Sequence, residues 1–334
     1  MREASATRAS DKAGQRPLRI GLALGAGGAR GWAHLGVLRR LGELGVPVDC
    51  VAGTSAGALV GAVYLARRLD LLVELARQLD WRQTAKLFFE VNFPRSGLLT
   101  GRHIVRLLRE VVPLDTIEQL DCPFAAVATD LEANCEVVLT GGDLIHAIRA
   151  SISIPGIFTP VRHGSRLLVD GALTNPLPVS VLRSMHVDRV IAVDVNLRAG
   201  LGKAVPEADA TPQPAPDAPA SPMEELASRI RQRMPELSQH TDKINALIRR
   251  WKHRNDEPSI FEVLTQSTRI FENQITRSRL LAHPPDILIQ PAVGDIATLD
   301  FWRSPQAIAA GIRAVDEKRS EIQALMASIQ PLDP

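Results

Sequence analysis

Short apolar runs alternate with amphipathic stretches over the first two hundred residues of the chain. The run at residues 18–24 (LRIGLAL) is followed by a glycine-rich loop and by a helical pattern over residues 32–44, with Gly45 as its stop. A second apolar run, which begins at Val48, leads into a helical pattern over residues 56–68. This β-loop-α-β-α order predicts a parallel sheet with right-handed crossovers.

The alternation of strands and helices continues along the chain. Further strands are predicted at residues 124–129, 135–139, 166–169, 190–195 and 287–290. Further helices are predicted at residues 71–79, 101–111, 144–150 and, as one long helix, 305–329. The pattern therefore predicts an α/β domain to which one strand, flanked by prolines, returns from late in the chain.

Composition changes abruptly at Arg198. Residues 204–222 are rich in Pro, Ala and Asp and cannot bury enough apolar surface to build a core. The following segment shows an amphipathic helical pattern with arginines at positions 229, 231, 233, 249 and 250. This basic face is either an ordinary solvated surface or a surface that meets anionic lipid headgroups.

These changes divide the chain into five predicted parts. They are a disordered tail (1–17), an α/β domain (18–198), a Pro/Ala-rich flexible linker (199–222), a basic amphipathic helical segment (223–284), and a returning strand with a C-terminal helix that packs on the α/β domain (285–334).

Composition narrows the function classes. The 334 residues are 45% hydrophobic and 23% charged, and a net charge of +2 with 4% aromatic content argues against nucleic acid as a partner. Three cysteines without C-x-x-C spacing predict neither a disulfide framework nor a zinc site, and they fit a reducing compartment. The polar N-terminus has no apolar h-region, and no apolar run approaches the roughly 18 residues of a spanning helix. We expect a cytoplasmic protein, with peripheral contact at the inner face of the membrane as the alternative.

The sequence Gly53-Thr54-Ser55-Ala56-Gly57 joins the second strand to its helix. Glycines two before and two after Ser55 relieve crowding in a sharp strand-to-helix turn that exposes the serine hydroxyl. The adjacent helix N-terminus favours developing negative charge. Ser55 is therefore the candidate nucleophile of an acyl hydrolase, and the alternative is a tight turn with a capping serine.

The glycine loop after the first strand, Gly25 to Gly31 (GAGGARG), allows two interpretations. A dinucleotide-binding loop of G-x-G-x-x-G spacing needs glycine at position 30, where Arg30 stands, and a P-loop needs Gly-Lys-Ser/Thr, which is absent. The other interpretation is an oxyanion hole, in which Gly27 and Gly28 donate backbone N–H groups to the substrate oxygen. Arg30 then either fixes the loop or attracts an anionic headgroup.

A nucleophilic serine needs a base. None of the histidines after Ser55 stands at a recognisable strand end, and His34 lies within the first helix, where a packing or capping role is expected. Asp170 ends a predicted strand and is followed by Gly171 and Ala172, small residues that allow a close approach to Ser55. It is the candidate base, since burial raises carboxylate basicity, and the alternative is an ordinary turn aspartate.

Three motifs together resemble the patatin-like phospholipase family, in its bacterial branch: the glycine loop at 25–31, Gly-Thr-Ser-Ala-Gly at 53–57, and Asp-Gly-Ala at 170–172. Residues 150–158 and 170–178 add to the likeness, which covers about residues 18–196. Ala26 departs from it, since the plant-type pattern has glycine there.

The resemblance implies a three-layer α/β/α sandwich with a mostly parallel sheet. It also implies a Ser55–Asp170 dyad, oxyanion donors at Gly27 and Gly28, and neither metal nor cofactor. Supporting positions are Arg30, Gly31, Gly53, Gly57 and Gly171.

The expected function is hydrolysis of acyl esters in phospholipids or lysophospholipids through an acyl-Ser55 intermediate. A general carboxylesterase or thioesterase with the same dyad is one alternative, and a regulatory protein that kept the fold without the chemistry is another. The apolar Leu87-Phe88-Phe89, with Phe93, is a candidate membrane-docking edge. The oligomeric state stays open.

Overall fold

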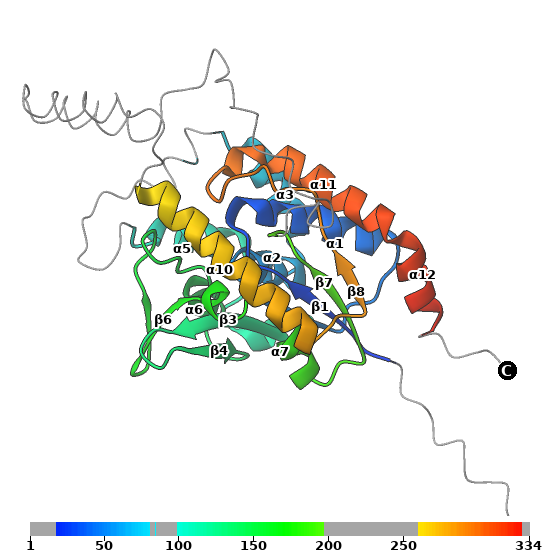
Figure 1. Cartoon of the computed structure of the whole chain (residues 1–334), viewed down its shortest axis with the longest axis horizontal. Helices are drawn as coiled ribbons and strands as arrows, with labels where there is room; N and C mark the ends of the chain where they lie inside the picture. The colour runs from blue at the N-terminus through cyan, green and yellow to red at the C-terminus, as the bar shows by residue number, and fades with distance from the viewer. Residues whose placement is uncertain (1–17, 81–83, 85–98, 197–259, 329–334) are drawn as a thin grey trace, which may run out of the picture. The chain divides into compact units, whose positions relative to one another are not determined.

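The fold is built on a sheet of eight strands in a computed structural model that describes residues 18–80, 84, 99–196 and 260–328 (Figure 1). The strand order is β5-β6-β3-β2-β1-β7-β8, and β4 also pairs with β3. The strands are β1 (Ile20–Leu24), β2 (Cys50–Thr54), β3 (Phe124–Asp130), β4 (Cys135–Leu139), β5 (Val161–His163), β6 (Arg166–Asp170), β7 (Arg189–Val193) and β8 (Ile287–Ile289).

The centre of the sheet is parallel, because β3, β2, β1, β7 and β8 all run in one direction. The pairs β3–β4, β3–β6 and β5–β6 are antiparallel. The central strands β1 and β2 are buried at every position, as expected for parallel strands covered on both faces. This arrangement is the mostly parallel α/β sheet that the sequence predicts.

Helices cover both faces of the sheet. On one face, Leu22 and Leu24 of β1 join a large apolar core with α1, α2, α3, α6, α11 and α12. On the other face, Ala23 of β1 and Ala52 of β2 join a smaller core with α7, against which Leu280 of α10 packs. The helices are α1 (Ala33–Glu43), α2 (Ala56–Leu65), α3 (Leu69–Gln78), α5 (Arg102–Val111), α6 (Leu144–Ser151), α7 (Val179–Ser184), α10 (Ile260–Ala282), α11 (Ser304–Glu317) and α12 (Arg319–Ala327).

The register of β3 decides what meets at the carboxyl edge of the sheet. Val127 pairs with Thr54, the last residue of β2, and the next residue, Ala128, pairs with Asp170, the last residue of β6. Strand β6 therefore continues the pairing of β3 from the point where β2 ends. Because β2 and β6 approach from opposite directions, the residues that follow β2 face the end of β6.

Most of the predicted elements are present, with one clear correction. Residues 305–329 do not form a single helix, because the helical conformation is interrupted at Lys318 between α11 and α12. The break lets Ile322 and Leu325 of α12 reach the same core as Val315 of α11. Strand β5 and helix α7 were not predicted, since each is too short to show a hydrophobic period.

Several predictions fall on residues that the structure does not describe. These are the tail at 1–17, the apolar Leu87-Phe88-Phe89 with Phe93, the linker at 199–222, and the arginines at 229–250. The division of the chain into five parts therefore stays a prediction. Over the described ranges, none of the helices combines the length and apolarity that crossing a membrane requires.

Candidate active site

Ser55 stands between β2 and α2 in a strained backbone conformation, with φ 55° and ψ −121°. A non-glycine residue in this region costs on the order of 1–3 kcal/mol and is held by its surroundings. Ser151, at the end of α6, stabilises this backbone conformation. Its Oγ accepts a hydrogen bond from the Ser55 N–H at 2.9 Å and donates one to the Val127 carbonyl at 2.6 Å. The side chain of Ser55 is thereby fixed at the carboxyl edge of the sheet, 4% exposed.

Asp170, at the end of β6, receives the hydroxyl of Ser55. Ser55 Oγ donates to Asp170 Oδ2 at 2.6 Å, and the Ala172 N–H donates to Oδ1 at 2.8 Å. Within the part of the chain that the structure describes, these two hydrogen bonds are the carboxylate's polar contacts, with no Lys or Arg in an ion pair. Burial outweighs both bonds and raises the pKa of Asp170 from 3.8 to about 7. Such a carboxylate accepts a proton far more readily than one in water.

The glycine loop contains two adjacent backbone N–H groups for which the described residues offer no acceptor. The amides of Gly25, Ala26, Ala29 and Arg30 each donate to a carbonyl, those of Val193, Pro176, Thr298 and Gly27 respectively. Among the described residues, no acceptor is found for the amides of Gly27 and Gly28. Gly27 is buried and Gly28 is half-buried. Because buried N–H groups are nearly always paired in native proteins, the Gly27 donor that lacks an acceptor among these residues, with that of Gly28 beside it, is available to another group.

Close packing explains the glycines around the site. Gly28 has φ +57°, and a Cβ there would lie 2.5 Å from the Thr298 carbonyl oxygen. A Cβ on Gly31 would collide with the Cβ of Ala56, so the glycine loop lies directly against the residue after Ser55. At three further predicted glycines a Cβ would meet backbone atoms: of Ala58 at Gly53, of Leu24 at Gly57 and of Val127 at Gly171. At Gly27 it would meet the side chain of Val195.

Arg30 turns away from solvent and holds the loop. It is 1% exposed, donates through Nε and Nη2 to Asn196 Oδ1 at 3.2 and 2.8 Å, and donates through Nη1 to the Ile296 carbonyl at 3.1 Å. Burial lowers the pKa of Arg30 to about 10, which leaves it charged at neutral pH. Of the two roles weighed for Arg30, these contacts favour fixing the loop over attracting a headgroup.

His34 packs under the same loop, in α1. It is fully buried, and its Nε2 lies 2.8 Å from the Gly25 carbonyl oxygen. Burial lowers the pKa of His34 to about 4, so the ring is neutral and donates its Nε2 proton to this carbonyl. The ring therefore supports the loop, which agrees with the packing role expected from the sequence.

Comparisons with known proteins agree with this geometry. A family model described as "Patatin-like phospholipase" matches residues 22–183, which include Ser55 and Asp170. An NTE family protein of Mycobacterium tuberculosis is 32% identical over 88% of this chain and 89% of its own length. The chain belongs to the patatin-like phospholipase family. This confirms the resemblance drawn from the three sequence motifs.

Larger animal proteins match about half of this chain. Neuropathy target esterase sws of Drosophila melanogaster is 35% identical over 53% of this chain and 13% of its own length. Patatin-like phospholipase domain-containing protein 7 of Rattus norvegicus is 37% identical over 54% of this chain and 14% of its own length. The shared part is thus about half of the present chain.

Three polar residues at the site were missed from the sequence. Ser151 is the last residue of α6, and its contact with Ser55 depends on the fold. Asn196 stands three residues after the end of β7, and a polar residue beyond the carboxyl end of a parallel strand was a usable signal. Glu272 of α10, which accepts from Asn196, lies beyond the patatin-like match at 22–183 and gave no signal at all.

Proposed function

We propose that this protein hydrolyses carboxylic esters of lipids, with Ser55 as nucleophile and Asp170 as its base. The observation that supports this most directly is the 2.6 Å hydrogen bond between Ser55 Oγ and Asp170 Oδ2, in surroundings that exclude water from both groups. A buried serine and carboxylate in contact form a pair that can move one proton between them.

The reaction would proceed in two halves. In the first, Ser55 Oγ attacks the ester carbonyl carbon while its proton passes to Asp170, and the collapsing tetrahedral intermediate takes that proton back on the leaving alcohol oxygen. In the second, water attacks the acyl-Ser55 ester, gives its proton to Asp170, and the proton returns to Ser55 Oγ as the free acid leaves. Each half begins and ends with an ionised Asp170.

The pKa of Asp170 suits this cycle. An aspartate at its ordinary pKa of 3.8 is a weak acceptor for a serine proton, whereas one near 7 is both ionised and basic at neutral pH. The Ala172 N–H keeps Oδ1 occupied and so leaves Oδ2 for Ser55.

The backbone N–H groups of Gly27 and Gly28 would donate hydrogen bonds to the oxyanion. The negative charge that forms on the former carbonyl oxygen is stabilised by about 3–4 kcal/mol for each well-placed donor in sites of this kind. Gly31 packs this loop against the residue after Ser55, which supports both groups acting on one substrate.

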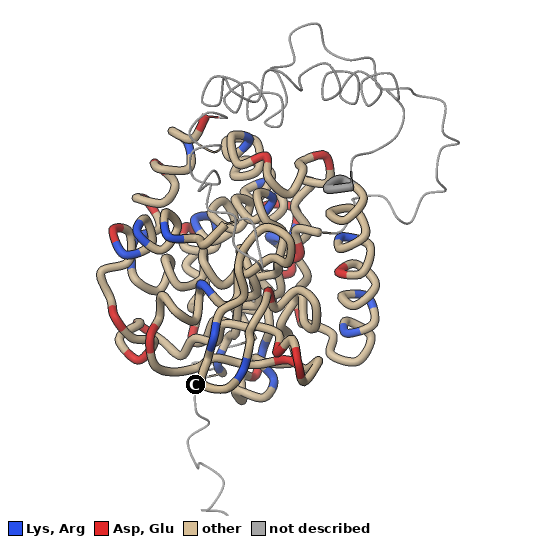
Figure 2. The backbone as a smooth tube through the Cα atoms, turned by 90° about the vertical axis from the view of Figure 1, so that its left-hand side faces the viewer, with Lys and Arg blue, Asp and Glu red and all other residues tan. Residues whose placement is uncertain are grey.

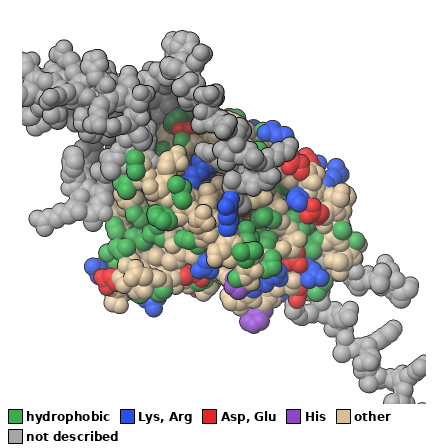
Figure 3. Space-filling model, in the orientation of Figure 1, with side chains coloured by type: hydrophobic (Ala, Val, Ile, Leu, Met, Phe, Trp, Pro, Cys, Tyr) green, Lys and Arg blue, Asp and Glu red, His purple; other side chains and the backbone are tan. Residues whose placement is uncertain are grey.

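The choice of lipid over general esters rests on two observations. The printed names of two relatives contain "esterase" and "phospholipase". In addition, Ile270 and Phe271 of α10 are 59% and 64% exposed, next in sequence to Glu272, whose pKa the charge of Asp170 helps to raise. Further hydrophobic side chains are visible at the surface on the face that Figure 3 draws. Exposed apolar side chains beside a site suit contact with a lipid surface.

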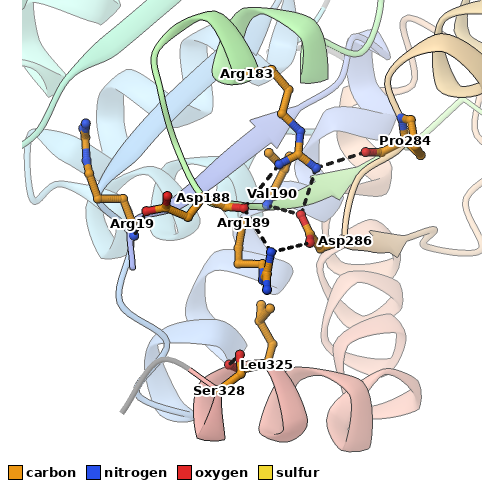
Figure 4. A network of polar contacts seen from close by, with 9 residues as sticks. All are labelled: Arg19, Arg183, Asp188, Arg189, Val190, Pro284, Asp286, Leu325 and Ser328. Carbon is orange, nitrogen blue, oxygen red and sulfur yellow. Dashed lines mark hydrogen bonds and ion pairs between the residues drawn. The ribbon is translucent and has the colours of Figure 1, made fainter. Parts of the chain in front are cut away.

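Hydrolysis assays test the proposal. Wild type, Ser55→Ala and Asp170→Asn would be assayed on p-nitrophenyl butyrate and on phosphatidylcholine vesicles, with Ser328→Ala and Asp286→Asn as matched controls (Figure 4). We expect Ser55→Ala and Asp170→Asn to lose at least about 1,000-fold in kcat on both substrates while both controls stay active. A higher wild-type rate on vesicles favours a lipase, and a higher rate on the soluble ester favours a general esterase. An inactive wild type, or an active Asp170→Asn, would contradict the proposal.

A further inference from the structure

Helix α10 returns to the α/β unit from far along the chain and is tied to it at three levels. Arg269 donates to the Gly294 carbonyl at 3.0 Å, and Glu272 accepts from Asn196. Arg279 donates to Ser180 Oγ at 3.3 Å and pairs with Glu136. In Figure 1 the helix, coloured yellow to orange, runs across the face of the sheet that also bears α7.

The contact between Glu272 and Asn196 is connected to the glycine loop by further hydrogen bonds. Asn196 Nδ2 donates to Glu272 Oε2 at 2.9 Å, and Asn196 Oδ1 accepts both Nε and Nη2 of Arg30. Arg30 stands two residues after Gly28 in the sequence, and its backbone N–H donates to the Gly27 carbonyl at 3.2 Å. A Cβ on Gly27 would lie 3.6 Å from Asn196 Oδ1, so the amide group of Asn196 lies beside the loop itself.

The same chain of hydrogen bonds also brings the charge of Glu272 near the buried guanidinium of Arg30. A guanidinium buried as deeply as that of Arg30 is costly unless negative charge lies near it. Glu272 is the largest of the charges that raise the pKa of Arg30, ahead of Asp194 and Asp300, while Arg269 lowers it. Without Glu272, the desolvated guanidinium loses part of the field that keeps it in place.

The Glu272 carboxyl group also interacts electrostatically with Asp170, the candidate base. Burial and, after it, the charge of Asp170 raise the pKa of Glu272 to about 7, although Arg30, Asn196 and Arg269 oppose the rise. Glu272 thus lies within electrostatic reach of both halves of the site, the dyad and the glycine loop.

We propose that Glu272 is a positioning residue of the active site, which holds the oxyanion loop through Asn196 and Arg30. Glu272 then links helix α10 to the active site, although the helix lies outside residues 22–183 that the patatin-like family model matches. The inference rests on the proposed function, since it assigns Gly27 and Gly28 the role given there. Its distinctive consequence is that loss of the Glu272 carboxyl group slows the chemical step without weakening substrate binding.

Steady-state kinetics on p-nitrophenyl butyrate test this, with wild type, Glu272→Ala and Glu272→Gln. We expect Glu272→Ala to lower kcat about 10- to 100-fold with KM changed less than about twofold, because a small misplacement of donors costs that much. Glu272→Gln should recover part of the loss, since its amide oxygen can still accept from Asn196 but its neutral side chain does not restore the charge near Arg30. Asn196→Ala interrupts the same hydrogen bonds between Glu272 and Arg30. If Glu272→Ala folds poorly, Asn196→Ala provides the test, and we expect the same loss in kcat.

Two controls separate positioning from anchoring. Glu321→Ala removes a carboxyl group paired with Lys318 on α12 and should leave kcat unchanged. Arg279→Gln removes another tie of α10 and should lower Tm while kcat changes less than about twofold. An equal fall in kcat for Arg279→Gln and Glu272→Ala, or unchanged kcat in Glu272→Ala and Asn196→Ala, overturns the inference and leaves the proposed function standing. An inactive wild type defeats the proposed function and this inference with it.

Discussion

The two edges of the parallel sheet use aspartate in opposite ways. At the amino edge, Asp188 Oδ2 accepts from the Arg19 N–H, and Asp286 Oδ2 accepts from the Val190 N–H, so each caps the start of a strand. Asp286 is also paired with Arg183 at 2.9 Å and with Arg189 at 3.6 Å (Figure 4). At the carboxyl edge, Asp170 accepts from a hydroxyl group and meets no cation among the described residues.

The difference shows that environment, and not residue type, separates a structural aspartate from a candidate base. The side chain of Asp286 keeps 23% of its surface exposed beside arginines that are 35% and 40% exposed, and water and cations stabilise its charge. Asp170 is 3% exposed, and its charge is stabilised by two hydrogen bonds. Lys, Arg, Asp and Glu are spread over the chain trace as a whole (Figure 2), so the contrast arises from burial and not from a charged patch.

The largest difference between the edges should appear in a pair of glycine variants. Gly28 at the carboxyl edge and Gly45 at the amino edge both have positive φ, +57° and +70°. A Cβ at Gly28 meets the Thr298 carbonyl, whereas a Cβ at Gly45 meets nothing within 4 Å. We expect Gly28→Ala to lower kcat by about 100- to 1,000-fold, as for loss of an oxyanion donor.

Gly45→Ala should lower stability by about 1 kcal/mol and leave kcat unchanged, since it adds only backbone strain. Ester hydrolysis and thermal unfolding of the two variants would show this. Equal effects of both variants on kcat would mean that the glycine loop has no special role at the carboxyl edge.

Replacement of aspartate by asparagine should change stability in opposite directions at the two edges. Asp170 has a folded-state pKa near 7 against 3.8 unfolded, so between these values the native state binds more protons and its stability falls as pH rises. The cost is complete above pH 7 and amounts to at most about 4 kcal/mol, at about 1.4 kcal/mol for each unit. Asp170→Asn removes this cost and should therefore unfold at a higher temperature than wild type at pH 8.

This advantage of Asp170→Asn should shrink as pH is lowered from 7 towards 4, because the carboxyl group of native wild type becomes protonated, and below pH 3.8 the unfolded-state group is protonated as well. Thermal unfolding at pH 5 and pH 8 measures it. A variant less stable than wild type at pH 8 would show that the carboxylate is stabilised in the native state and is not a desolvated base.

The smallest effect is expected from Asp286→Asn. It weakens two partly exposed ion pairs, which are worth about 1 kcal/mol or less, while the amide oxygen can still cap Val190. Tm should fall by a few degrees at most, with kcat unchanged and with a smaller fall in 0.5 M NaCl than in 0.05 M NaCl because salt screens the pairs. A large loss of activity would mean that the amino edge is coupled to the site.

The sequence predicted what local pattern can encode. The strand-turn-helix around Ser55, the strand ending at Asp170 and the glycine loop all follow from residues close together in the chain. Their meeting point depends on the register of β3, in which Val127 and Ala128 pair with Thr54 and Asp170, and no sequence pattern states that register. The family resemblance supplied the pairing of Ser55 with Asp170 in advance, but not the register.

The residues that sequence analysis missed are held by long-range contacts. Ser151 reaches Ser55 across 96 positions, and Glu272 reaches Asn196 across 76. The break at Lys318 was missed because residues 305–329 keep a helical period on both sides of it, and the turn serves core packing that only the fold defines.

The central claim, a Ser55–Asp170 dyad, is tested most directly by covalent labelling with a fluorophosphonate, followed by intact mass and peptide mapping across pH 5–9. The account predicts one label, on Ser55, whose rate rises with pH to a plateau with a midpoint near 7, where Asp170 and its neighbour Glu272 titrate. Asp170→Asn should be labelled at least about 100-fold more slowly. Labelling of another residue, or labelling of Asp170→Asn at the wild-type rate, would contradict the account.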